Sequence, residues 1–479
     1  MIKTILCGTH PGQYNGYSKV VFELAKYLSS CEDIQLHIFG FQNFYDKKEH
    51  KIERLLPSNV EIYDVFQNEE PKNKGFGENL IVDYILEKDP HIVIIYNDLI
   101  VINQLLEKIK TIPSRKFKIV PYIDIVYKNE KNNLIANINN ICDAGIMFTE
   151  YWKNIIEFQG FTKPLHILEH GFNSKQFYPI PKPIARKYFS MSEDDFIIVN
   201  LNRNQPRKRW DICMMAYVKF ISKHIGEKIK LLIATNMQGG WDLVDIMISE
   251  CRKYNISTDD FKKHLIVLQN PQQISDFDIN VLYNLSDIGI NTCDGEGFGL
   301  CNFEQAGVGV PQIIPSVGGF KDFFDDTNSL IIDPKWTYYC DHSRDFVSGE
   351  AEICDINDYV NALEYYFTNK DAITKHGQTA RENILKNYSW TEKGKQLENI
   401  IKIETKDLDL KPKQQININE IDINDIININ NNTNTNTNTN NEELEIITGS
   451  EKKTNIDIDT MNTDDMKKML KELLEKNKN

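Results

Sequence analysis

One pattern repeats through most of the first 400 residues: a short run rich in β-branched residues is followed by a longer amphipathic stretch. This pattern predicts strands separated by helices, because strands bury short apolar runs and surface helices bury one stripe. Strand and helix in turn favour a parallel sheet with helices on both faces. The first strands are expected at residues 2–7, 34–39, 92–96, 118–122 and 144–148, with a helix at 18–28.

The pattern breaks once and then resumes. Residues 167–183 are rich in turn formers, and the chain of 479 residues is too long for one ordinary core. A second series of strands is expected at residues 196–201, 229–235, 265–269, 288–292 and 312–315. We therefore predict an α/β protein with two doubly wound, Rossmann-like domains, residues 1–180 and 181–384, and a helix near 385–403 that crosses back to complete the first.

The last part of the chain has a different composition. Residues 416–441 alternate Asn, Ile, Asp and Thr with little diversity, so residues 404–479 are expected to form a disordered tail. Apolar residues follow helical spacing only at 464–476. A marginal helix is expected there, because short isolated helices are unstable in water, and a docking or self-association helix is the alternative.

Composition narrows the class of protein. The net charge of −14 argues against a general nucleic-acid binder, which needs concentrated Lys and Arg. The chain starts with an apolar strand pattern rather than a basic leader, and no apolar run is long enough to span a bilayer. Nine scattered cysteines without Cys-x-x-Cys spacing favour a reduced, cytoplasmic protein. Basic and apolar residues at 105–120 leave peripheral contact with anionic lipid open beside an ordinary solvated helix.

The segment 294–311 has the strongest chemical content. It reads Asp-Gly-Glu-Gly-Phe-Gly-Leu-Cys-Asn-Phe-Glu-Gln-Ala-Gly-Val-Gly-Val-Pro, with Glu296 and Glu304 eight positions apart. Glu296 falls in a glycine turn that can press against a ligand, and Glu304 falls one turn into a helix expected to start near Leu300. A helix N-terminus offers N–H groups to a diphosphate, and a carboxylate one turn later can accept ribose hydroxyls.

Two further segments carry charge or glycine after a predicted strand. Residues 203–210 read Arg-Asn-Gln-Pro-Arg-Lys-Arg-Trp, which taken alone is a solvated basic turn or a nucleic-acid patch. Residues 316–322 read Ser-Val-Gly-Gly-Phe-Lys-Asp, which taken alone is an ordinary turn from strand to helix. Because one segment precedes the glutamate segment and the other follows it, both segments can also be interpreted as parts of one binding site.

In combination these segments resemble retaining glycosyltransferases of the two-domain GT-B fold, family 4 type. The resemblance is good over residues 148–400 and looser before them, and residues 169–179 resemble the interdomain hinge of the family. It implies two facing Rossmann-like domains, a UDP- or GDP-sugar donor on the second and an unknown sugar, lipid, protein or small-molecule acceptor on the first. It also implies no metal and no cofactor, because fixed cations stabilise the leaving diphosphate.

The resemblance assigns roles residue by residue. Arg203 and Lys208 match the residues that contact the diphosphate, Glu296 the one that holds hydroxyls of the transferred sugar, and these three are the expected catalytic residues. Glu304 matches the ribose carboxylate. The remaining donor-binding matches are Gly297, Phe298, Gly299, Leu300, Gly318 and Gly319, with Asp322 after them, and Gly16 in the first glycine loop.

The first domain departs from the family at two places. Ile123 stands before Asp124 where many relatives have a histidine, so His10 and Asp98 are considered as substitutes. Asn15 precedes Gly16 where a second glycine is usual. The family's nucleobase slot falls near Leu268 and Asn270.

The sequence therefore predicts a retaining, metal-independent glycosyltransferase. The main alternative is a catalytically weak or inactive relative that binds the nucleotide sugar in a regulatory or scaffolding role, and a sugar-nucleotide epimerase ranks last. A nicotinamide enzyme is disfavoured, since Gly-x-Gly-x-x-Gly is absent from the first loop. Asp276-Phe-Asp278 and Cys340-Asp-His342 are short metal-like motifs without the further ligands that a metal site needs.

Overall fold

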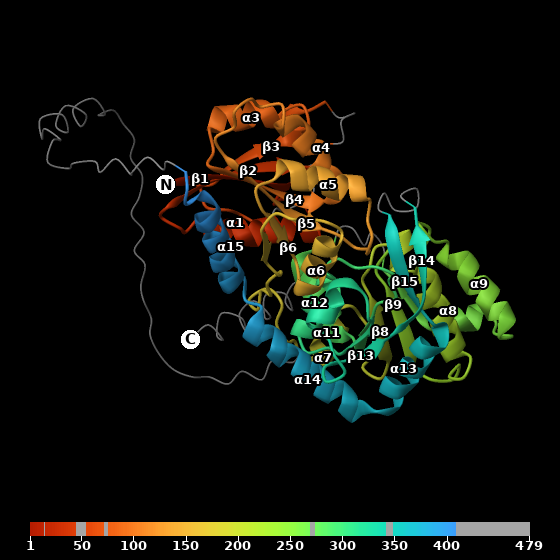
Figure 1. Ribbon diagram of the computed structural model, residues 1–479. Coiled ribbons are helices and arrows are strands. Elements are labelled where there is room, and N and C mark those ends of the chain that lie inside the picture. Colours follow the sequence, from red (N-terminus) through yellow and green to blue (C-terminus); the bar gives the residue numbers. More distant parts are fainter. Residues whose placement is uncertain (14, 45–53, 71–74, 269–273, 342–347, 409–479) are drawn as a thin grey trace, which may run out of the picture. The chain divides into compact units, whose positions relative to one another are not determined.

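The computed structural model describes residues 1–13, 15–44, 54–70, 75–268, 274–341 and 348–408. Its first sheet has seven parallel strands in the order β3-β2-β1-β4-β5-β6-β7 (Figure 1). The strands are β1 (Ile2–Thr9), β2 (Ile34–Phe41), β3 (Glu61–Asp64), β4 (Ile92–Asp98), β5 (Lys118–Asp124), β6 (Gly145–Met147) and β7 (Leu165–Ile167). We call this sheet and the helices on it the first half.

The second sheet has six parallel strands in the order β10-β9-β8-β11-β12-β13. They are β8 (Phe196–Asn200), β9 (Ile229–Ile233), β10 (Leu265–Val267), β11 (Ile288–Ile290), β12 (Gln312–Pro315) and β13 (Ser329–Ile332). An antiparallel pair follows, β14 (Pro334–Cys340) with β15 (Gly349–Cys354). This sheet, the antiparallel pair and their helices form the second half.

Helices connect the strands, as the sequence pattern predicts. Those of the first half are α1 (Gly16–Leu28), α2 (Val65–Asn68), α3 (Ile81–Lys88), α4 (Leu99–Ile109), α5 (Asn132–Ile141) and α6 (Glu150–Phe158). Those that follow are α7 (Lys182–Tyr188), α8 (Trp210–Ile221), α9 (Leu243–Lys253), α10 (Thr258–Lys262), α11 (Asp276–Leu285), α12 (Leu300–Gly307), α13 (Ile356–Thr368), α14 (Lys370–Asn387) and α15 (Trp390–Thr405). Two short 3₁₀ helices, η2 (Pro206–Lys208) and η4 (Gly318–Asp322), lie in loops.

The central strands are apolar along their whole length because both faces of the sheet are covered. In β4, Ile94 packs into a core cluster on one face, and Val93 and Ile95 pack into a separate cluster on the other. All three side chains are fully buried. Burial on two faces explains why these strands read as continuous apolar runs rather than as alternating ones.

The strand order places the loops that carry charge next to one another. In the second sheet the order reverses between β8 and β11, so the loops after these neighbouring strands leave at the same edge. In the first sheet the order reverses between β1 and β4. Ligands of open parallel sheets bind outside the carboxyl ends of strands at such a reversal, which directs attention to the loops after β1, β8 and β11.

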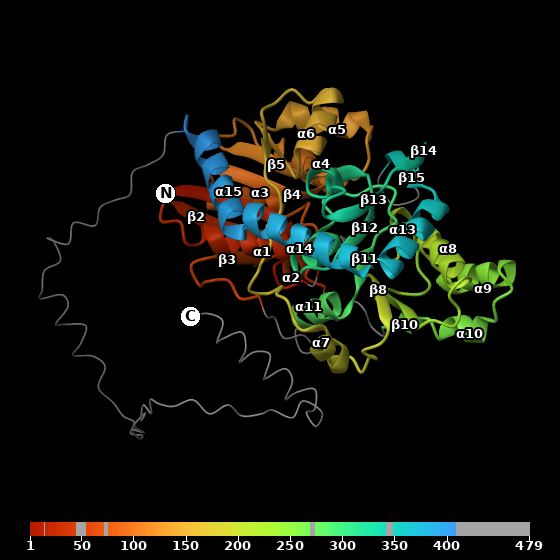
Figure 2. The same ribbon diagram turned by 90° about the horizontal axis from the view of Figure 1, so that it is seen from below.

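The chain passes between the halves twice, and the two passages lie side by side. Phe172 and Ser389 form a parallel bridge, and a Cβ added to Gly171 would lie 2.6 Å from Trp390. Helix α15 then packs along α1 of the first half, where Tyr27 Oη donates to Glu398 at 3.0 Å (Figures 1 and 2). Residues 1–410 form one compact unit, so independent domains divided near residue 180 remain a prediction.

The fold class predicted from sequence is confirmed, with differences at its edges. Helix α1 begins at Gly16 rather than residue 18, since Asn15 caps it by accepting the backbone N–H of Ser18 at 2.9 Å. The short strands β3, β7 and β13 and the β14–β15 pair were not predicted, because each is brief or lacks an apolar run. The tail was predicted from residue 404, but α15 continues to Thr405; the tail beyond residue 408, with its helix at 464–476, lies outside the described residues. None of the described helices is long and apolar enough to cross a bilayer.

Candidate functional site

A buried ion pair joins the basic turn after β8 to the glycine turn after β11. Lys208 Nζ contacts Glu296 Oε2, and the Arg207 guanidinium lies 3.6 Å from Glu296 Oε1. Burial alone would raise the pKa of Glu296, but Lys208 and Arg207 lower it below its usual value. Glu296 is therefore held ionised between two cations.

Arg207 and Arg209 of this turn also face carboxylates or carbonyls of the chain itself. Arg207 donates to the Gly295 carbonyl at 3.2 Å, and Arg209 pairs with Asp211 at 2.7 Å. Lys208 is buried beside Glu296, so these cations line an enclosed site and do not form the open basic surface that a nucleic-acid backbone needs. This arrangement opposes the nucleic-acid interpretation of the motif.

Arg203 and Cys301 mark the solvent-accessible part of this region. Both side chains are exposed, yet the pKa of Arg203 is lowered by burial among neighbouring atoms and by Arg207. The pKa of Cys301 is raised by burial and by Glu304, and lowered by Lys19 and Lys208. Arg203 acts electrostatically on Cys301 and Glu296, and Cys301 on Glu304 and Lys208, so the structure brings Arg203, Lys208, Glu296 and Glu304 into one region.

The predicted Gly-Gly turn packs directly on the glutamate turn. Gly318 has a φ of +51°, and a Cβ there would lie 2.0 Å from the Glu296 carbonyl oxygen. A Cβ on Gly319 would lie 2.1 Å from the Gly297 carbonyl, and Gly319 N–H donates to the Glu296 carbonyl at 3.1 Å. Only glycine allows these backbones to approach so closely, so these glycines shape the turn that carries Glu296.

Helix α12 begins at Leu300 as predicted, and its first turn faces the other half. Gly299, with a φ of +86°, stands at the cap position and provides no side-chain acceptor for the first N–H groups. A Cβ on Gly16 would lie 3.5 Å from Leu300 Cδ2. The Phe298 side chain instead packs in the core, with its ring centroid 4.6 Å from that of His170.

Glu304 lies one turn into α12 and is held by two side chains. Lys19 Nζ from α1 approaches both carboxylate oxygens at 2.9 Å, and Tyr283 Oη from α11 donates to Oε2 at 2.9 Å. Burial raises the pKa of Glu304, and Lys19 and Tyr283 oppose that rise. Lys19 and Tyr283 were not predicted, since nothing local in the sequence indicates which helix faces α12.

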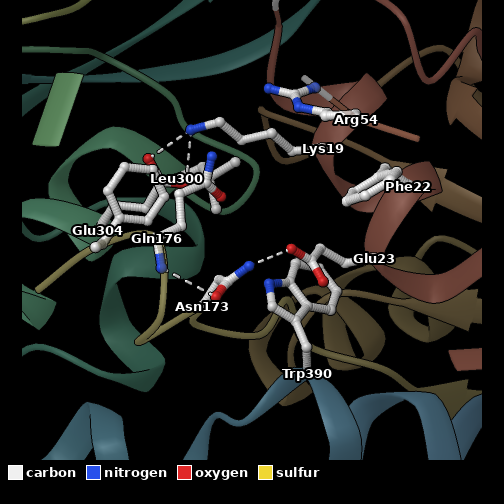
Figure 3. A pocket seen from close by; sticks show the side chains of 10 residues that line it. Lys19, Phe22, Glu23, Arg54, Asn173, Gln176, Leu300, Glu304 and Trp390 are labelled. Atoms are coloured by element: carbon white, nitrogen blue, oxygen red, sulfur yellow. Dashed lines mark hydrogen bonds and ion pairs between the residues drawn. The ribbon is translucent and has the colours of Figure 1, made fainter. Parts of the chain in front are cut away.

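A pocket opens beside this pair, between the two halves. It is lined by ten residues: Lys19, Phe22, Glu23, Arg54, Asn173, Gln176, Phe177, Leu300, Glu304 and Trp390 (Figure 3). Predicted donor-binding residues therefore share a pocket with residues of α1 and of the passage between the halves.

Asp124 is a carboxylate of the first half that lies against the glutamate turn. A Cβ on Gly297 would lie 2.2 Å from its Oδ1, which has no hydrogen-bond partner within the described part of the chain. Tyr17 donates to its other oxygen. Burial raises the pKa of Asp124 to about 7, although Tyr17 and Arg207 lower it. Trp152 Nε1, which donates to the Gly297 carbonyl at 2.7 Å, fixes the turn opposite this carboxyl.

Of the residues considered as substitutes for the missing histidine, Asp98 stands beside Asp124 in the register of β4 and β5, and both Asp98 and His10 have local partners. Ile123 is fully buried in a core cluster, because alternation along β5 sends its side chain to the opposite face from Asp124. His10 Nδ1 accepts the Gly12 N–H at 3.0 Å, and Asp98 caps α4 by accepting two N–H groups at 3.0 and 3.1 Å. Both have local roles that explain their presence.

The motifs set aside from sequence also have local partners. Asp276 pairs with Arg54 at 2.9 Å, whereas Asp278 accepts from Tyr188 at 2.7 Å, so the two carboxylates diverge. Across the described ranges, no three His, Cys, Asp or Glu side chains cluster as metal ligands would, and His342 lies outside those ranges.

Three further predictions have mixed outcomes. Asp322 faces α6, where it accepts the Tyr151 N–H at 3.5 Å. Leu268 N–H donates to the Ile233 carbonyl at 3.0 Å, and Asn270 lies outside the described residues. The apolar residues of the basic segment 105–120 are mostly buried in the core, so the structure offers no support for lipid contact there.

Comparison with known proteins gives a partial sequence match. No protein-family model matches the chain. The chain is 24% identical over 156 residues to D-inositol 3-phosphate glycosyltransferase from Rhodococcus erythropolis. The match covers 32% of this chain and 34% of that protein, so the aligned part spans about a third of the relative's length.

Solved structures resemble the chain over most of its length. Sucrose-phosphate synthase from Thermosynechococcus elongatus has a TM-score of 0.61 at 14% identity, covering 84% of this chain and 99% of its own. Anabaena HepE in complex with UDP-glucose has a TM-score of 0.61 at 12% identity, covering 84% and 100%. Identities this low establish a shared fold alone, and that fold is the GT-B arrangement of two Rossmann-like halves.

Proposed function

We propose that the chain is a retaining, metal-independent glycosyltransferase of the family 4 type that uses a UDP- or GDP-sugar. The observation that carries the proposal is the convergence of Arg203, Lys208, Glu296 and Glu304 from the loops after β8 and β11, at the reversal of strand order. The sequence match to a named glycosyltransferase and the fold shared with a UDP-glucose complex point in the same direction.

The donor would lie along the second half. Arg203, Lys208 and the N-terminus of α12 would contact the diphosphate, and Glu304 would accept the ribose hydroxyls. Breaking the bond between sugar and phosphate places charge on the leaving oxygen. Fixed cations there stabilise the transition state more than the ground state, which is the task a metal ion performs in other transferases.

Glu296 would have a second task, to hold hydroxyls of the transferred sugar. Because Glu296 pairs with Lys208, the anion would face the sugar of the donor and the cation would face the adjacent diphosphate. In front-face retention the leaving phosphate accepts the proton of the acceptor hydroxyl, so no protein nucleophile is required. Asp124, whose Oδ1 lies against Gly297 and has no hydrogen-bond partner among the described residues, would accept a hydrogen bond from a sugar hydroxyl.

The experiment is a donor panel followed by a transfer assay. Thermal shifts with UDP-glucose, UDP-N-acetylglucosamine and GDP-mannose identify the donor, since a ligand that binds the native state raises the melting temperature. Hydrolysis of that donor is then followed by NMR, in which an α product from an α-linked donor shows retention. Activity that persists in EDTA supports metal independence.

Two variants separate the site from a general loss of charge. Lys208→Ala should lower turnover at least about a hundredfold, the scale for losing one preorganised charge contact in a transition state. Lys228→Ala removes a cation of the same half whose side chain is 65% exposed and pairs with Asp194 on the surface, so it should change nothing. Nucleotide binding without any turnover would favour the inactive, regulatory alternative, and equal activity of both variants would contradict the site.

A further inference from the structure

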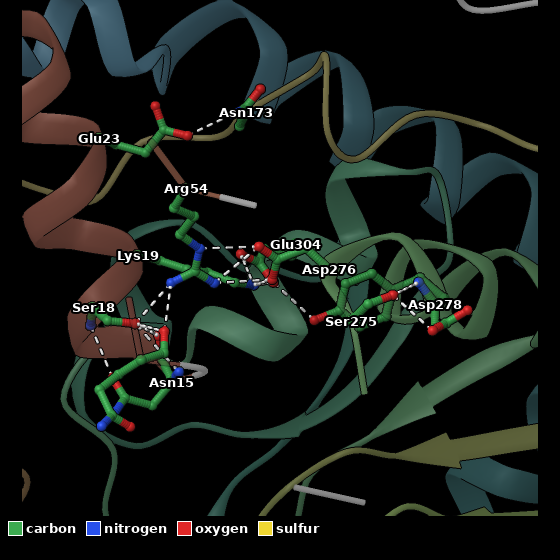
Figure 4. Close-up of polar contacts among 12 residues, drawn as sticks. Asn15, Ser18, Lys19, Glu23, Arg54, Asn173, Ser275, Asp276, Asp278 and Glu304 are labelled. Atoms are coloured by element: carbon green, nitrogen blue, oxygen red, sulfur yellow. Dashed lines mark hydrogen bonds and ion pairs between the residues drawn. The ribbon is translucent and has the colours of Figure 1, made fainter. Parts of the chain in front are cut away.

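Four charged side chains form a cluster between the halves, two from each. Arg54 of the first half makes a two-pronged contact with Asp276 at 2.9 and 3.0 Å. Lys19, also of the first half, contacts both oxygens of Glu304 at 2.9 Å and lies 3.7 Å from Asp276 (Figure 4). We call Lys19, Arg54, Asp276 and Glu304 the ionic cluster.

The ionic cluster is largely removed from solvent. The side chains of Lys19, Arg54, Asp276 and Glu304 are 12%, 8%, 5% and 5% exposed. Lys19 Nζ also lies 4.5 Å from the centre of the Phe177 ring. Screening by solvent is weak at such burial, so each carboxylate requires a partner, and one left alone is costly.

Lys19 contacts the same carboxylate oxygens of Glu304 to which the proposed function assigns the ribose hydroxyls. A vicinal diol would donate two hydrogen bonds to the carboxylate, but Lys19 already faces both oxygens and Tyr283 takes one of them. Ammonium and diol cannot occupy the same side of one carboxylate. In this arrangement of the halves the ribose position is therefore filled by a side chain of the protein.

We propose that Lys19 competes with the nucleotide for Glu304. Binding of the donor must then replace the contact between Lys19 and Glu304 with hydrogen bonds from ribose hydroxyls. The inference rests on the proposed function, because it requires a nucleotide at Glu304. Asp276, 3.7 Å from Lys19 Nζ, is the carboxylate that can receive the displaced ammonium while it remains paired with Arg54. Without a nucleotide, Lys19 balances the charge of Glu304. When a nucleotide binds, the Lys19 ammonium moves from Glu304 to Asp276 within the same cluster.

The direction in which nucleotide affinity changes on removal of Lys19 tests the competition. If Lys19 binds a donor phosphate, removing it weakens nucleotide binding; if Lys19 competes for Glu304, removing it strengthens binding. Calorimetric titration with UDP and with GDP should show Lys19→Met binding the preferred nucleotide about tenfold more tightly than the unaltered chain, the equivalent of one lost ion pair.

Lys26→Met is the matched control. Lys26 lies on the same helix and is exposed, without a contact to Glu304, so its loss removes equal charge and should leave affinity unchanged. Lys19→Gln, which keeps a polar group of similar length, replaces Lys19→Met if the latter fails to fold, and should shift affinity in the same direction.

The outcomes are distinct. Unchanged or weaker binding by the folded Lys19 variants, with normal binding by the unaltered chain, would overturn the inference alone. An equal gain in Lys26→Met would also overturn it, since the effect would then be general charge. Absence of nucleotide binding by every protein would overturn the proposed function and the inference with it.

Discussion

Lys208 and Glu296 form a buried ion pair that ties the loop after β8 to the loop after β11. Their side chains are 9% and 8% exposed. Two residues expected to contact different parts of one donor thus contact each other. The pair keeps Glu296 ionised and orients both side chains, which is preorganisation of the kind that transition-state stabilisation requires.

The first prediction concerns the stability that this pair provides. Lys208→Met should lower the free energy of unfolding by about 3 kcal/mol, since it removes the cation that directly contacts a buried carboxylate. Glu296→Gln should also destabilise. The double variant should lose less than the sum of the two, by about 1 kcal/mol or more. Urea unfolding of the four proteins measures this coupling, and strictly additive losses would show that the pair contributes nothing.

Sequence predicted this part of the molecule well, because the relevant signals are local. A strand followed by a glycine turn and a helix fixes where Glu296 and Glu304 stand on their elements, and the structure starts α12 at Leu300 as expected. Parallel-sheet topology then brings the loops after β8 and β11 together. The partners Lys19, Tyr283 and Asp124 were outside such reasoning, since they depend on how distant elements face one another.

A second prediction uses the close approach of the two halves at Gly297. A methyl group there would lie 2.2 Å from Asp124 Oδ1, far inside contact distance. Gly297→Ala should force the glutamate turn away from the first half and lower sugar transfer by at least about tenfold, because small misplacements are costly in catalysis. The steady-state rate of transfer is the measurement.

Gly226→Ala is the control for that change. Apart from its chain neighbours, no atom of the described residues lies within 4 Å of a Cβ added to Gly226, so the alanine variant should keep full activity. If Gly297→Ala also kept full activity, the close approach of Asp124 to this turn would be irrelevant to function.

A third prediction concerns Asp124 and pH. Its pKa is raised from 3.8 to about 7 by burial, so the folded state holds this proton more tightly than the unfolded chain does. The resulting stability is present below about pH 4 and is lost as pH rises through about 7. Asp124→Asn should therefore match the unaltered chain in melting temperature at low pH and exceed it at pH 8. Scanning calorimetry across this range measures the difference.

The same variant separates a structural role from a functional one. If Asp124 contacts a sugar, Asp124→Asn should lower the rate of transfer while leaving the affinity for UDP unchanged. Asp89→Asn, on the exposed C-cap of α3, should alter neither the pH dependence nor the rate. A melting difference that does not change with pH would contradict the raised pKa.

The missing histidine shows why a motif departure is hard to interpret from sequence. Ile123 is fully buried in the core of the first half, so Ile123→His would place a polar ring among apolar side chains and destabilise the fold. Loss of activity in that variant would report unfolding rather than catalysis. Asp124 is the better position to change, because its neighbours in the other half are known.

The last prediction concerns the hydroxyl that holds Glu304. Tyr283 Oη donates to Glu304 Oε2 at 2.9 Å and lowers a pKa that burial raises. Tyr283→Phe keeps the ring packed against Phe177 but removes this hydrogen bond, so the pKa of Glu304 should rise further. Ribose hydroxyls donate best to the ionised carboxylate. As pH falls, affinity for UDP should therefore begin to decline at a higher pH in Tyr283→Phe than in the unaltered chain. Titrations between pH 5 and pH 8 measure this, with Tyr365→Phe on the exposed face of α13 as the control; superimposable profiles for both variants would separate Glu304 from nucleotide binding.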